Sequence, residues 1–258
     1  MQIETEERTR ASPFTVSKIL DRKQENSSNF FHYFPVNLRE MDNDAKLRPD
    51  ILQALFDQGF MGMEIEEEHG GAGLSFTSSC LVVEEISRID PSVSIMVDIH
   101  NTLTNNAVRF WGSPELQQRW LPRLATDTVS SFCLSEAGSG SDAFAMKTTA
   151  IPNADKSAYT INGTKLWISN AKEAGVFLVF ANASPDKGYK GITAFMVDAA
   201  TEGVSVGPTE NKLGTSSLLI GCKSNMGYIR TCNNEIFRTL LCCCWSFVTV
   251  GASVVVAA

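Results

Sequence analysis

The spacing of hydrophobic residues predicts helices over the first half of the chain. Beyond Pro49 the apolar side chains recur at intervals that place them on one face of a helix, namely Ile51, Leu52, Leu55 and Phe56. Pro49 suits the first helical turn because its missing N–H would have no partner there, and Gly59 suits the left-handed residue that follows a helix. The same pattern predicts a second helix over residues 77–88, just before Pro91.

Two more helices are expected before residue 128. The run 91–111 is long and mostly apolar, so it predicts a buried helix that ends at Gly112. The sequence Ser-Pro-Glu at 113–115 supplies an N-cap, a first-turn proline and a first-turn acid, which together open a short helix. A helix is also expected over residues 5–41, but the polar and aromatic segment 23–35 interrupts it.

After about residue 128 the helical stripes give way to short runs rich in β-branched and aromatic residues. Asn162-Gly163 lies between two such runs, and Asn-Gly is a strong hairpin signal. Further β runs cover 176–181 and 192–197, each bounded by glycine or proline. The sequence therefore predicts an α+β fold, with an N-terminal all-helical domain followed by an antiparallel β domain of barrel-like or sandwich type.

We expect the helical domain to span residues 1–128, with 23–35 as an atypical insert, and the β domain to span 129–214. Residues 215–258 form an atypical tail, whose last part, 240–258, has no charged residue and contains three consecutive cysteines. A membrane anchor, a divergent domain and the product of an altered transcript are the alternatives for this tail.

Composition and charge exclude some classes of partner. The chain is 43% hydrophobic and 20% charged, with a net charge of −7, as expected for a globular protein. Net negative charge argues against nucleic acid and against anionic membrane surfaces, because both attract faces rich in Lys and Arg. The first residues have neither the apolar core of a secretory signal nor the Arg-rich character of an organelle presequence.

Cysteine and histidine form no pattern typical of a metal site or a disulfide framework. Only Cys80 and Cys133 lie before residue 214, which suits a reducing compartment. The three histidines, His32, His69 and His100, are scattered, so a surface or core role is favoured over metal ligation for each of them.

The string from Cys133 to Asp142 is the most informative part of the chain. It predicts the end of a strand that runs into a turn rich in glycine and serine. Gly138 and Gly140 permit close approach to the backbone, so such a turn can present N–H groups to a polar ring edge or to a phosphate. Read without its neighbours, it can equally be an ordinary Ser/Gly loop.

This string resembles the first signature of the acyl-CoA dehydrogenase family at every specified position, and residues 162–170 resemble the second signature. Segments 68–75 and 83–85 resemble the N-terminal domain of that family, and 188–195 and 210–214 resemble its later β segments. The resemblance extends from about Met41 to Gly214. Several long matches in the same order identify the chain as a member of this family.

The resemblance implies an FAD site on the β domain. The segment that would hold the flavin comprises Phe132, Cys133, Leu134, Ser135, Glu136, Ala137, Gly138, Ser139, Gly140 and Ser141, acting through backbone groups and the Ser135 hydroxyl. Trp167 would pack on the flavin ring, with Ile168 next to it and Ser169 near N5. Without the resemblance, Trp167 would be interpreted as a core residue of a hairpin.

The resemblance also implies contacts with acyl-CoA from Ser141 and Tyr189, although Tyr189 alone would be interpreted as a surface aromatic. Glu136 and Asp142 are not predicted to form an acid–base pair. Glu136 is expected to organise the loop, and Asp142 is expected to act as an N-cap or turn residue.

The expected reaction is α,β-dehydrogenation of a short or branched acyl-CoA of the 2-methylbutyryl-CoA type, as in isoleucine degradation. The resemblance is closest to short/branched-chain-specific members, and it implies an electron-transferring flavoprotein as partner, a homo-oligomer such as a tetramer, and the mitochondrial matrix. No metal is expected.

We assign no catalytic residue. In the family, a Glu that removes the α-proton lies in a C-terminal helical domain, and the signature of that domain does not appear after Gly214. A non-catalytic flavin- or acyl-CoA-binding fragment and an acyl-CoA oxidase are therefore the alternatives to a dehydrogenase.

Overall fold

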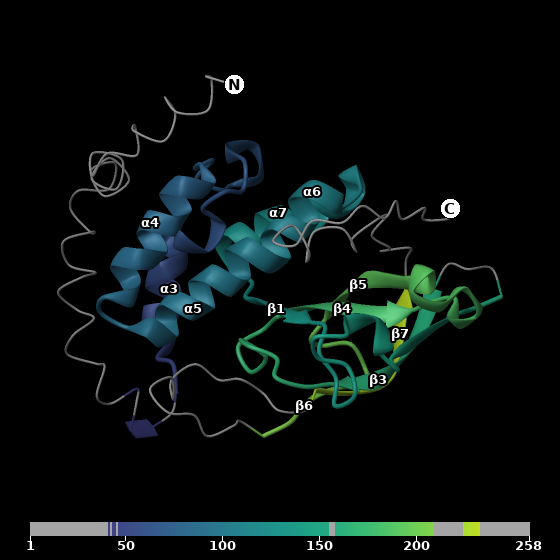
Figure 1. Ribbon diagram of the computed structural model, residues 1–258. Coiled ribbons are helices and arrows are strands. Elements are labelled where there is room, and N and C mark those ends of the chain that lie inside the picture. The colour runs from purple at the N-terminus through teal and green to yellow at the C-terminus, as the bar shows by residue number, and fades with distance from the viewer. Residues whose placement is uncertain (1–40, 42, 45, 155–157, 209–223, 233–258) are drawn as a thin grey trace, which may run out of the picture.

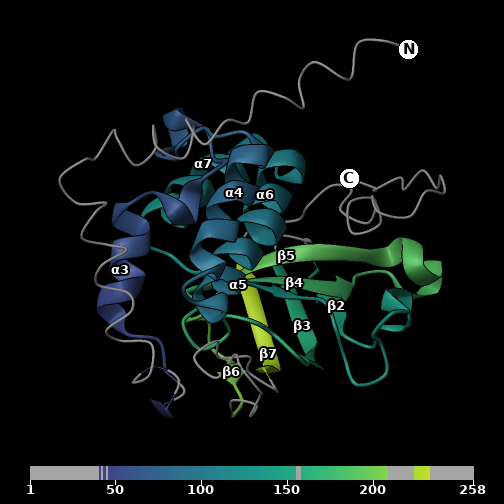
Figure 2. The same cartoon turned by 60° about the vertical axis from the view of Figure 1, so that its left-hand side comes forward.

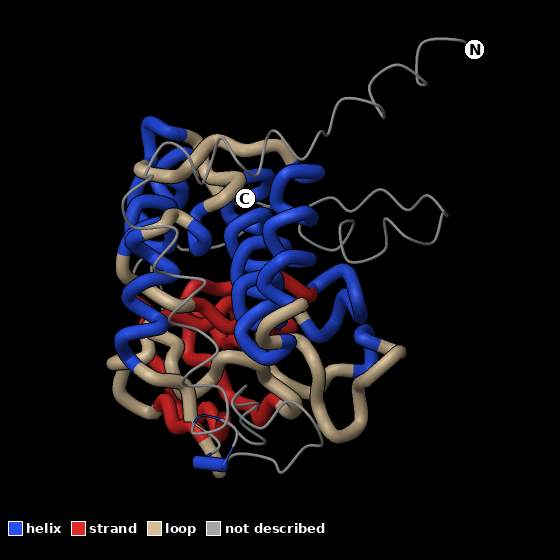
Figure 3. Tube along the Cα trace, turned by 90° about the vertical axis from the view of Figure 1, so that its left-hand side faces the viewer, coloured by secondary structure: helices blue, strands red, loops and turns tan. Residues whose placement is uncertain are grey.

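Helices and strands occupy separate layers of the molecule. The computed structural model describes residues 41, 43–44, 46–154 and 158–208, and the backbone of 224–232. Figure 1 and Figure 2 both show the helices gathered on one side of the sheet, and Figure 3 shows the same separation by colour. An α+β fold with the helices first is confirmed. The expected helix over 5–41, its insert and the end of the tail at 240–258 lie outside the described residues.

The expected helices form, and their caps explain where they begin. They are α3 (Pro49–Asp57), α4 (Phe76–Ser87), α5 (Pro91–Ile99), α6 (Asn106–Trp111) and α7 (Pro114–Thr126). The side chains of Ser75, Asp90 and Ser113 accept hydrogen bonds from the first-turn N–H groups of α4, α5 and α7. Gly59 has a φ of 77°, in the left-handed region that was predicted for it.

The run 91–111 is helical throughout but not uniformly α-helical. Residues His100–Asn105 form a π-helix between α5 and α6. Buried asparagine side chains accompany this change, because Asn101 donates to Phe60 O at 2.9 Å and accepts from Met63 N at 3.0 Å. These bonds attach the short 3-10 helix Phe60–Gly62 to the long helix.

Among the described residues, the sheet contains seven strands in the order β1-β4-β2-β3-β7-β6, and β5 pairs with β4. The strands are β1 (Ser130–Cys133), β2 (Thr149–Pro152), β3 (Ala158–Lys165), β4 (Val176–Asn182), β5 (Ile192–Asp198), β6 (Val204–Val206) and β7 (Ser224–Cys232). Strand β7 therefore lies within the segment that was expected to be an atypical tail, and it pairs with β3 and β6.

The sheet is mixed, which corrects the expectation of a wholly antiparallel domain. Strand β4 is parallel to β1 along its length and to β2 at one residue pair. Residues 134–175 leave the end of β1 and return to its beginning, where Gly175 N donates to Val129 O at 2.9 Å. Strand β4 consequently starts at the same end as β1 and runs in the same direction.

Asn162-Gly163 does not form the predicted hairpin turn. Both residues lie inside β3, which continues to Lys165 with a register shift against β7 between Ile161 and Gly163. A Cβ at Gly163 would collide with the side chain of Thr148. The glycine is thus required for a close approach of two segments, which is another role of glycine in a strand.

Strand β4 is buried on both faces. Val176, Leu178 and Phe180 belong to a hydrophobic cluster that includes Trp120 and Leu124 of α7. The intervening residues Phe177, Val179 and Ala181 belong to a second cluster with Cys133, Ile161, Ile168 and Phe195. The alternation of β4 therefore joins the helical layer to the interior of the β domain.

No helix in the part of the chain that the structure describes is long and apolar enough to cross a membrane. Within the same residues, His, Cys, Asp and Glu side chains form no group of three that could hold a metal ion.

His100 links the helical layer to β1 and has a core role, as expected. Its Nε2 lies 2.9 Å from Leu124 O, and its Nδ1 accepts from Ser130 N at 3.1 Å. The ring is completely buried, and burial lowers its pKa to about 4, although backbone hydrogen bonds with Leu124 and Met61 oppose the shift. His100 is therefore neutral when the protein is folded near neutral pH.

Because the folded pKa of His100 lies below the ordinary value of 6.5, the unfolded chain binds the proton more readily. We predict that this residue lowers the free energy of unfolding by about 2 kcal/mol between about pH 7.5 and about pH 5. Urea unfolding of the wild type and of His100→Gln at both values checks this. The variant should lose this part of the pH dependence, and an equal dependence in both proteins would contradict the assignment.

Candidate functional site

A tight turn rich in glycine follows β1. Glu136 N donates to Ser139 O at 2.9 Å, and Ser139 N donates to Glu136 O at 3.1 Å. The Ser139 hydroxyl donates to Asp142 O at 3.0 Å, and the Asp142 carboxylate accepts from Phe144 N at 3.2 Å. Asp142 thus caps the 3-10 helix Ala143–Ala145, which confirms its predicted role as a turn residue.

The outer side of this turn is open. Gly138 and Gly140 are exposed, and a Cβ built at either position would meet no atom within 4 Å among the described residues. Any side chain there would occupy the space beside the backbone. The turn can therefore bring its N–H groups against a flat or polar ligand.

The two predicted strings lie side by side. Leu166 N donates to Ser135 O at 2.8 Å, and the Ser131 hydroxyl donates to Ser169 O at 2.8 Å. Asn170 completes the connection, since its Nδ2 lies 3.3 Å from Ser130 O. Segments about thirty residues apart in the sequence thus lie next to one another.

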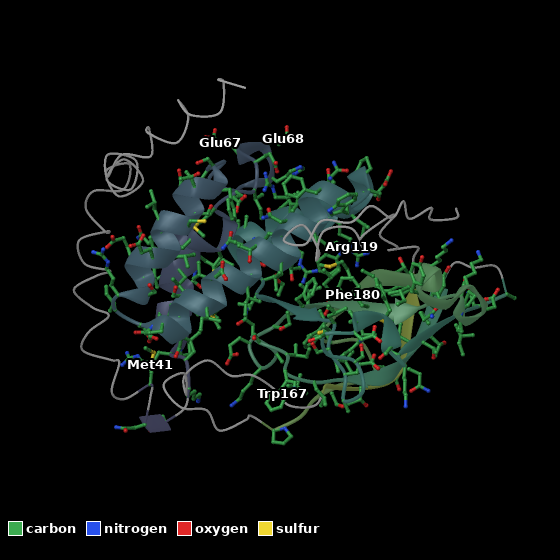
Figure 4. All side chains as sticks on the ribbon, in the orientation of Figure 1. Met41, Glu67, Glu68, Arg119, Trp167 and Phe180 are labelled. Atoms are coloured by element: carbon green, nitrogen blue, oxygen red, sulfur yellow. The ribbon has the colours of Figure 1, made fainter. Side chains whose placement is uncertain are left out.

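Trp167 has the most unusual conformation in this region. Its φ is 61°, in the left-handed region that costs a non-glycine residue about 1–2 kcal/mol. Its side chain is 59% exposed, and Figure 4 places it beside the strands, below the helical layer. The interpretation of Trp167 as a core residue is therefore wrong. A strained backbone that presents a bare indole to solvent is typical of a binding surface.

A buried ion pair lies beneath both strings. Lys165 Nζ is 2.7 Å from Glu136 Oε1 and 3.0 Å from Leu134 O. Burial tends to raise the pKa of Glu136, but hydrogen bonds from Lys165, Thr148 and Lys147 outweigh it and hold the pKa below its ordinary value. Burial also lowers the pKa of Lys165, and its bond to Glu136 opposes that shift. The predicted role of Glu136 in organising the loop is confirmed.

The other predicted flavin residues divide by their accessibility. The buried ones are Cys133, Ser139 and Ile168; the half-buried ones are Phe132, Leu134, Ser135, Glu136 and Ser169; and the exposed ones are Ala137, Gly138, Gly140, Ser141 and Trp167. Phe132 packs against Phe180, with ring centroids 5.0 Å apart. The buried members can support a ligand site only through backbone groups or packing, whereas the exposed ones can contact a ligand directly.

The residues expected to contact the substrate lie next to a residue that was not expected. Tyr189 is 42% exposed on the 3-10 helix Pro185–Gly191, and its ring lies 5.1 Å from that of Phe144. Phe144 comes three residues after the exposed Ser141. The aromatic contact therefore attaches the helix that carries Tyr189 to the end of the glycine turn.

Sequence reasoning assigned no role to Lys165, Asn170 or Glu173. The alternation of side chains along β3 indicates that Lys165 is buried, because it lies on the same face of the strand as the buried Ile161. Asn170 has a φ of 63° and is fully buried, which no local pattern indicates. Burial raises the pKa of Glu173 to about 7, so this side chain can hold a proton near neutral pH.

Comparisons with known proteins agree with the resemblance. Residues 32–128 match the family model for the acyl-CoA dehydrogenase N-terminal domain, and residues 131–222 match that for the middle domain. The second match continues beyond Gly214, where the resemblance was expected to end.

Two relatives illustrate how much of the protein is shared. The mitochondrial short/branched chain specific acyl-CoA dehydrogenase of Bos taurus is 52% identical over 175 residues, or 68% of this chain and 40% of that protein. A probable enzyme of the same name from Dictyostelium discoideum is 48% identical over 177 residues, or 69% of this chain and 43% of that protein. The chain thus spans about two fifths of the length of these relatives.

Solved structures share the fold. Butyryl-CoA dehydrogenase from Megasphaera elsdenii superposes with a TM-score of 0.79 at 26% identity, over 86% of this chain and 58% of that one. An acyl-CoA dehydrogenase complexed with FAD from Bacillus anthracis gives a TM-score of 0.72 at 28% identity, over 88% of this chain and 38% of that one.

The strain at Trp167 predicts a reversal of the usual ranking of alanine and glycine. At position 167 we expect Trp167→Gly to be more stable than Trp167→Ala by about 1 kcal/mol, because glycine adopts the left-handed backbone without the strain that alanine has there. At the exposed Phe110 in α6, the free energy of unfolding of Phe110→Ala should exceed that of Phe110→Gly by about 1 kcal/mol. Urea unfolding of the four variants measures both differences, and the same ranking at both positions would contradict the conformation of Trp167.

Proposed function

Because the chain belongs to the acyl-CoA dehydrogenase family, we propose that it binds FAD and catalyses α,β-dehydrogenation of a short or branched acyl-CoA. The observation that supports this best is the exposed Trp167, fixed in a left-handed conformation beside the open glycine turn. A planar surface next to exposed backbone N–H groups fits a flat, polar-edged ring system such as a flavin.

The residues divide the task of holding the cofactor. The indole of Trp167 would provide the stacking surface, and backbone groups from Ser135 to Ser141 would contact the polar edge of the ring. The half-buried Ser169 would lie near the reacting part of the ring. When bound, FAD supplies the acceptor for the hydride that leaves the substrate.

Ser141 and Tyr189 would contact the acyl-CoA, since both are exposed and the Phe144 ring connects their segments. The similarity to short/branched chain specific relatives supports a substrate of the 2-methylbutyryl-CoA type. We assign α-proton removal to no side chain among the described residues. As expected from the sequence, we propose that the base lies outside the helical domain and the β domain.

We further propose the mitochondrial matrix as the compartment, an electron-transferring flavoprotein as the electron acceptor and a homo-oligomer as the assembly. A mitochondrial relative at 52% identity supports the compartment. A solved structure that concerns an electron transferring flavoprotein of Acidaminococcus fermentans, with a TM-score of 0.78 at 28% identity over 86% of this chain and 57% of that one, supports the acceptor. The predicted division into domains at residues 128 and 214 belongs to this proposal.

The visible absorption spectrum of the purified chain tests the function. After reconstitution with FAD, the protein should be yellow, and anaerobic addition of 2-methylbutyryl-CoA should bleach the flavin bands as electrons leave the substrate. Trp167→Ala should weaken FAD binding about tenfold, because aromatic stacking contributes about 0.5–1.5 kcal/mol in addition to the burial of the indole surface.

Each other outcome has a distinct meaning. A colourless protein would overturn the proposed FAD site. A yellow protein that the thioester does not bleach would contradict dehydrogenation by this chain and support a flavin-binding role without turnover. Formation of peroxide in air would indicate an oxidase instead of a dehydrogenase.

A further inference from the structure

Lys165 is an unusual residue for the interior of a β domain. Its side chain is 0% exposed at the end of β3, although a buried ammonium is tolerated only when it is paired and hydrogen-bonded. Both conditions are met, because Nζ donates to Glu136 Oε1 and to Leu134 O. The cation therefore connects the end of β3 to the first residues of the glycine turn.

Glu136 connects a third segment to the same place. Its carboxylate accepts from Lys147 N at 2.6 Å, from Thr148 N at 3.1 Å and from the Thr148 hydroxyl, in addition to Lys165. These donors lie where the loop returns towards β2. One carboxylate thus joins the glycine turn to the segment before β2 and to the end of β3.

The ion pair also adjoins the strained tryptophan. Lys165 is followed by Leu166, whose N–H donates to Ser135 O, and then by Trp167. On the other side of Trp167, Ser169 O accepts from Ser131, and the Asn170 side chain donates to Met96 O and Ser130 O. Residues 166–170 are therefore held at both ends, and Lys165 provides the ionic part of the first attachment.

We propose that Lys165 and Glu136 are positioning residues, which hold the glycine turn and the Trp167 segment in the arrangement that receives the flavin. This inference rests on the proposed function. Both side chains are buried beneath the surface and act through their neighbours, so neither needs to touch the ligand. The pair keeps the two segments assembled in the ligand-free protein, and the ordering of these segments does not then oppose binding.

Hydrogen exchange and FAD titration of the full chain test the proposal together. Glu136→Gln removes the charge at nearly constant shape, and Thr148→Val removes one donor while both charges remain. We expect Glu136→Gln to speed exchange about tenfold in residues 135–148, which include the glycine turn, and in residues 166–170 without FAD, and to weaken FAD binding about tenfold. Thr148→Val should give smaller changes in the same two segments. The double variant Glu136→Gln/Lys165→Met should be less impaired than Lys165→Met alone, because it leaves no buried charge unpaired.

Glu66→Gln is the control, because Glu66 forms a more exposed ion pair with Arg109 in the helical domain, with Arg109 Nη2 2.8 Å from Glu66 Oε1. It should change neither the exchange of the two segments nor FAD binding. Unchanged exchange in Glu136→Gln would overturn the proposal, and so would faster exchange with unaltered FAD affinity. A wild-type chain that binds no FAD would overturn the proposed function instead, and the exchange data would then decide alone whether the pair joins the two segments.

Discussion

The arrangement of the molecule depends on the burial of β4 between two hydrophobic clusters, because this strand contacts the helices with one face and the rest of the β domain with the other. Leu178 faces the cluster that contains Trp120 and Leu124, and Val179 faces the cluster that contains Cys133. A shift of one residue would exchange the side chains that fill the two clusters, so close packing in both clusters favours one register. That register places β1, and with it the start of the glycine turn.

Polar groups between the layers make this placement specific. His100 from the π-helix and Asn170 from the tryptophan segment both bond to Ser130, His100 through the Ser130 N–H and Asn170 through the Ser130 carbonyl. Asn170 also donates to Met96 O in α5. Burial of a polar group costs free energy unless the group is hydrogen-bonded. These bonds therefore favour one relative position of helices and sheet. The candidate site is thus attached to the helical layer at the first residue of β1.

The ion pair of Glu136 and Lys165 differs from these neutral contacts. Desolvation of both charges costs several kcal/mol, so a buried pair is poor evidence for a contribution to stability. Its geometry is better explained by specificity, since the carboxylate accepts from two other segments, and both must meet the segment of Glu136 for the turn to form. A strained Trp167 beside it indicates that the surroundings determine the conformation of this surface.

Much of the fold could be predicted from local signals. Pro49 with Gly59, and the serine N-cap of α7, mark helix ends through backbone chemistry that depends on few neighbours. The parallel pairing of β1 with β4 could not be predicted, because it depends on the path of the chain between them. The hairpin predicted at Asn162-Gly163 was wrong because Gly163 is required by the close approach of the Thr148 side chain. A two-residue signal contains no information about such a contact between segments.

The same distinction holds for the site. The two strings were found through their resemblance, and Tyr189 with them, whereas Phe144 and Asn170 have roles that only the folded chain reveals. The alternation along β3 could have predicted that Lys165 is buried, but a lysine is seldom expected on a buried face.

The central claim is that residues 135–141 and 166–170 form one preassembled flavin surface. Hydrogen-exchange mass spectrometry of the chain with and without FAD tests it most directly. We expect added FAD to slow exchange in both segments together, with little change in α3 and α4. Protection confined to other elements, or absent from one of the two segments, would contradict it.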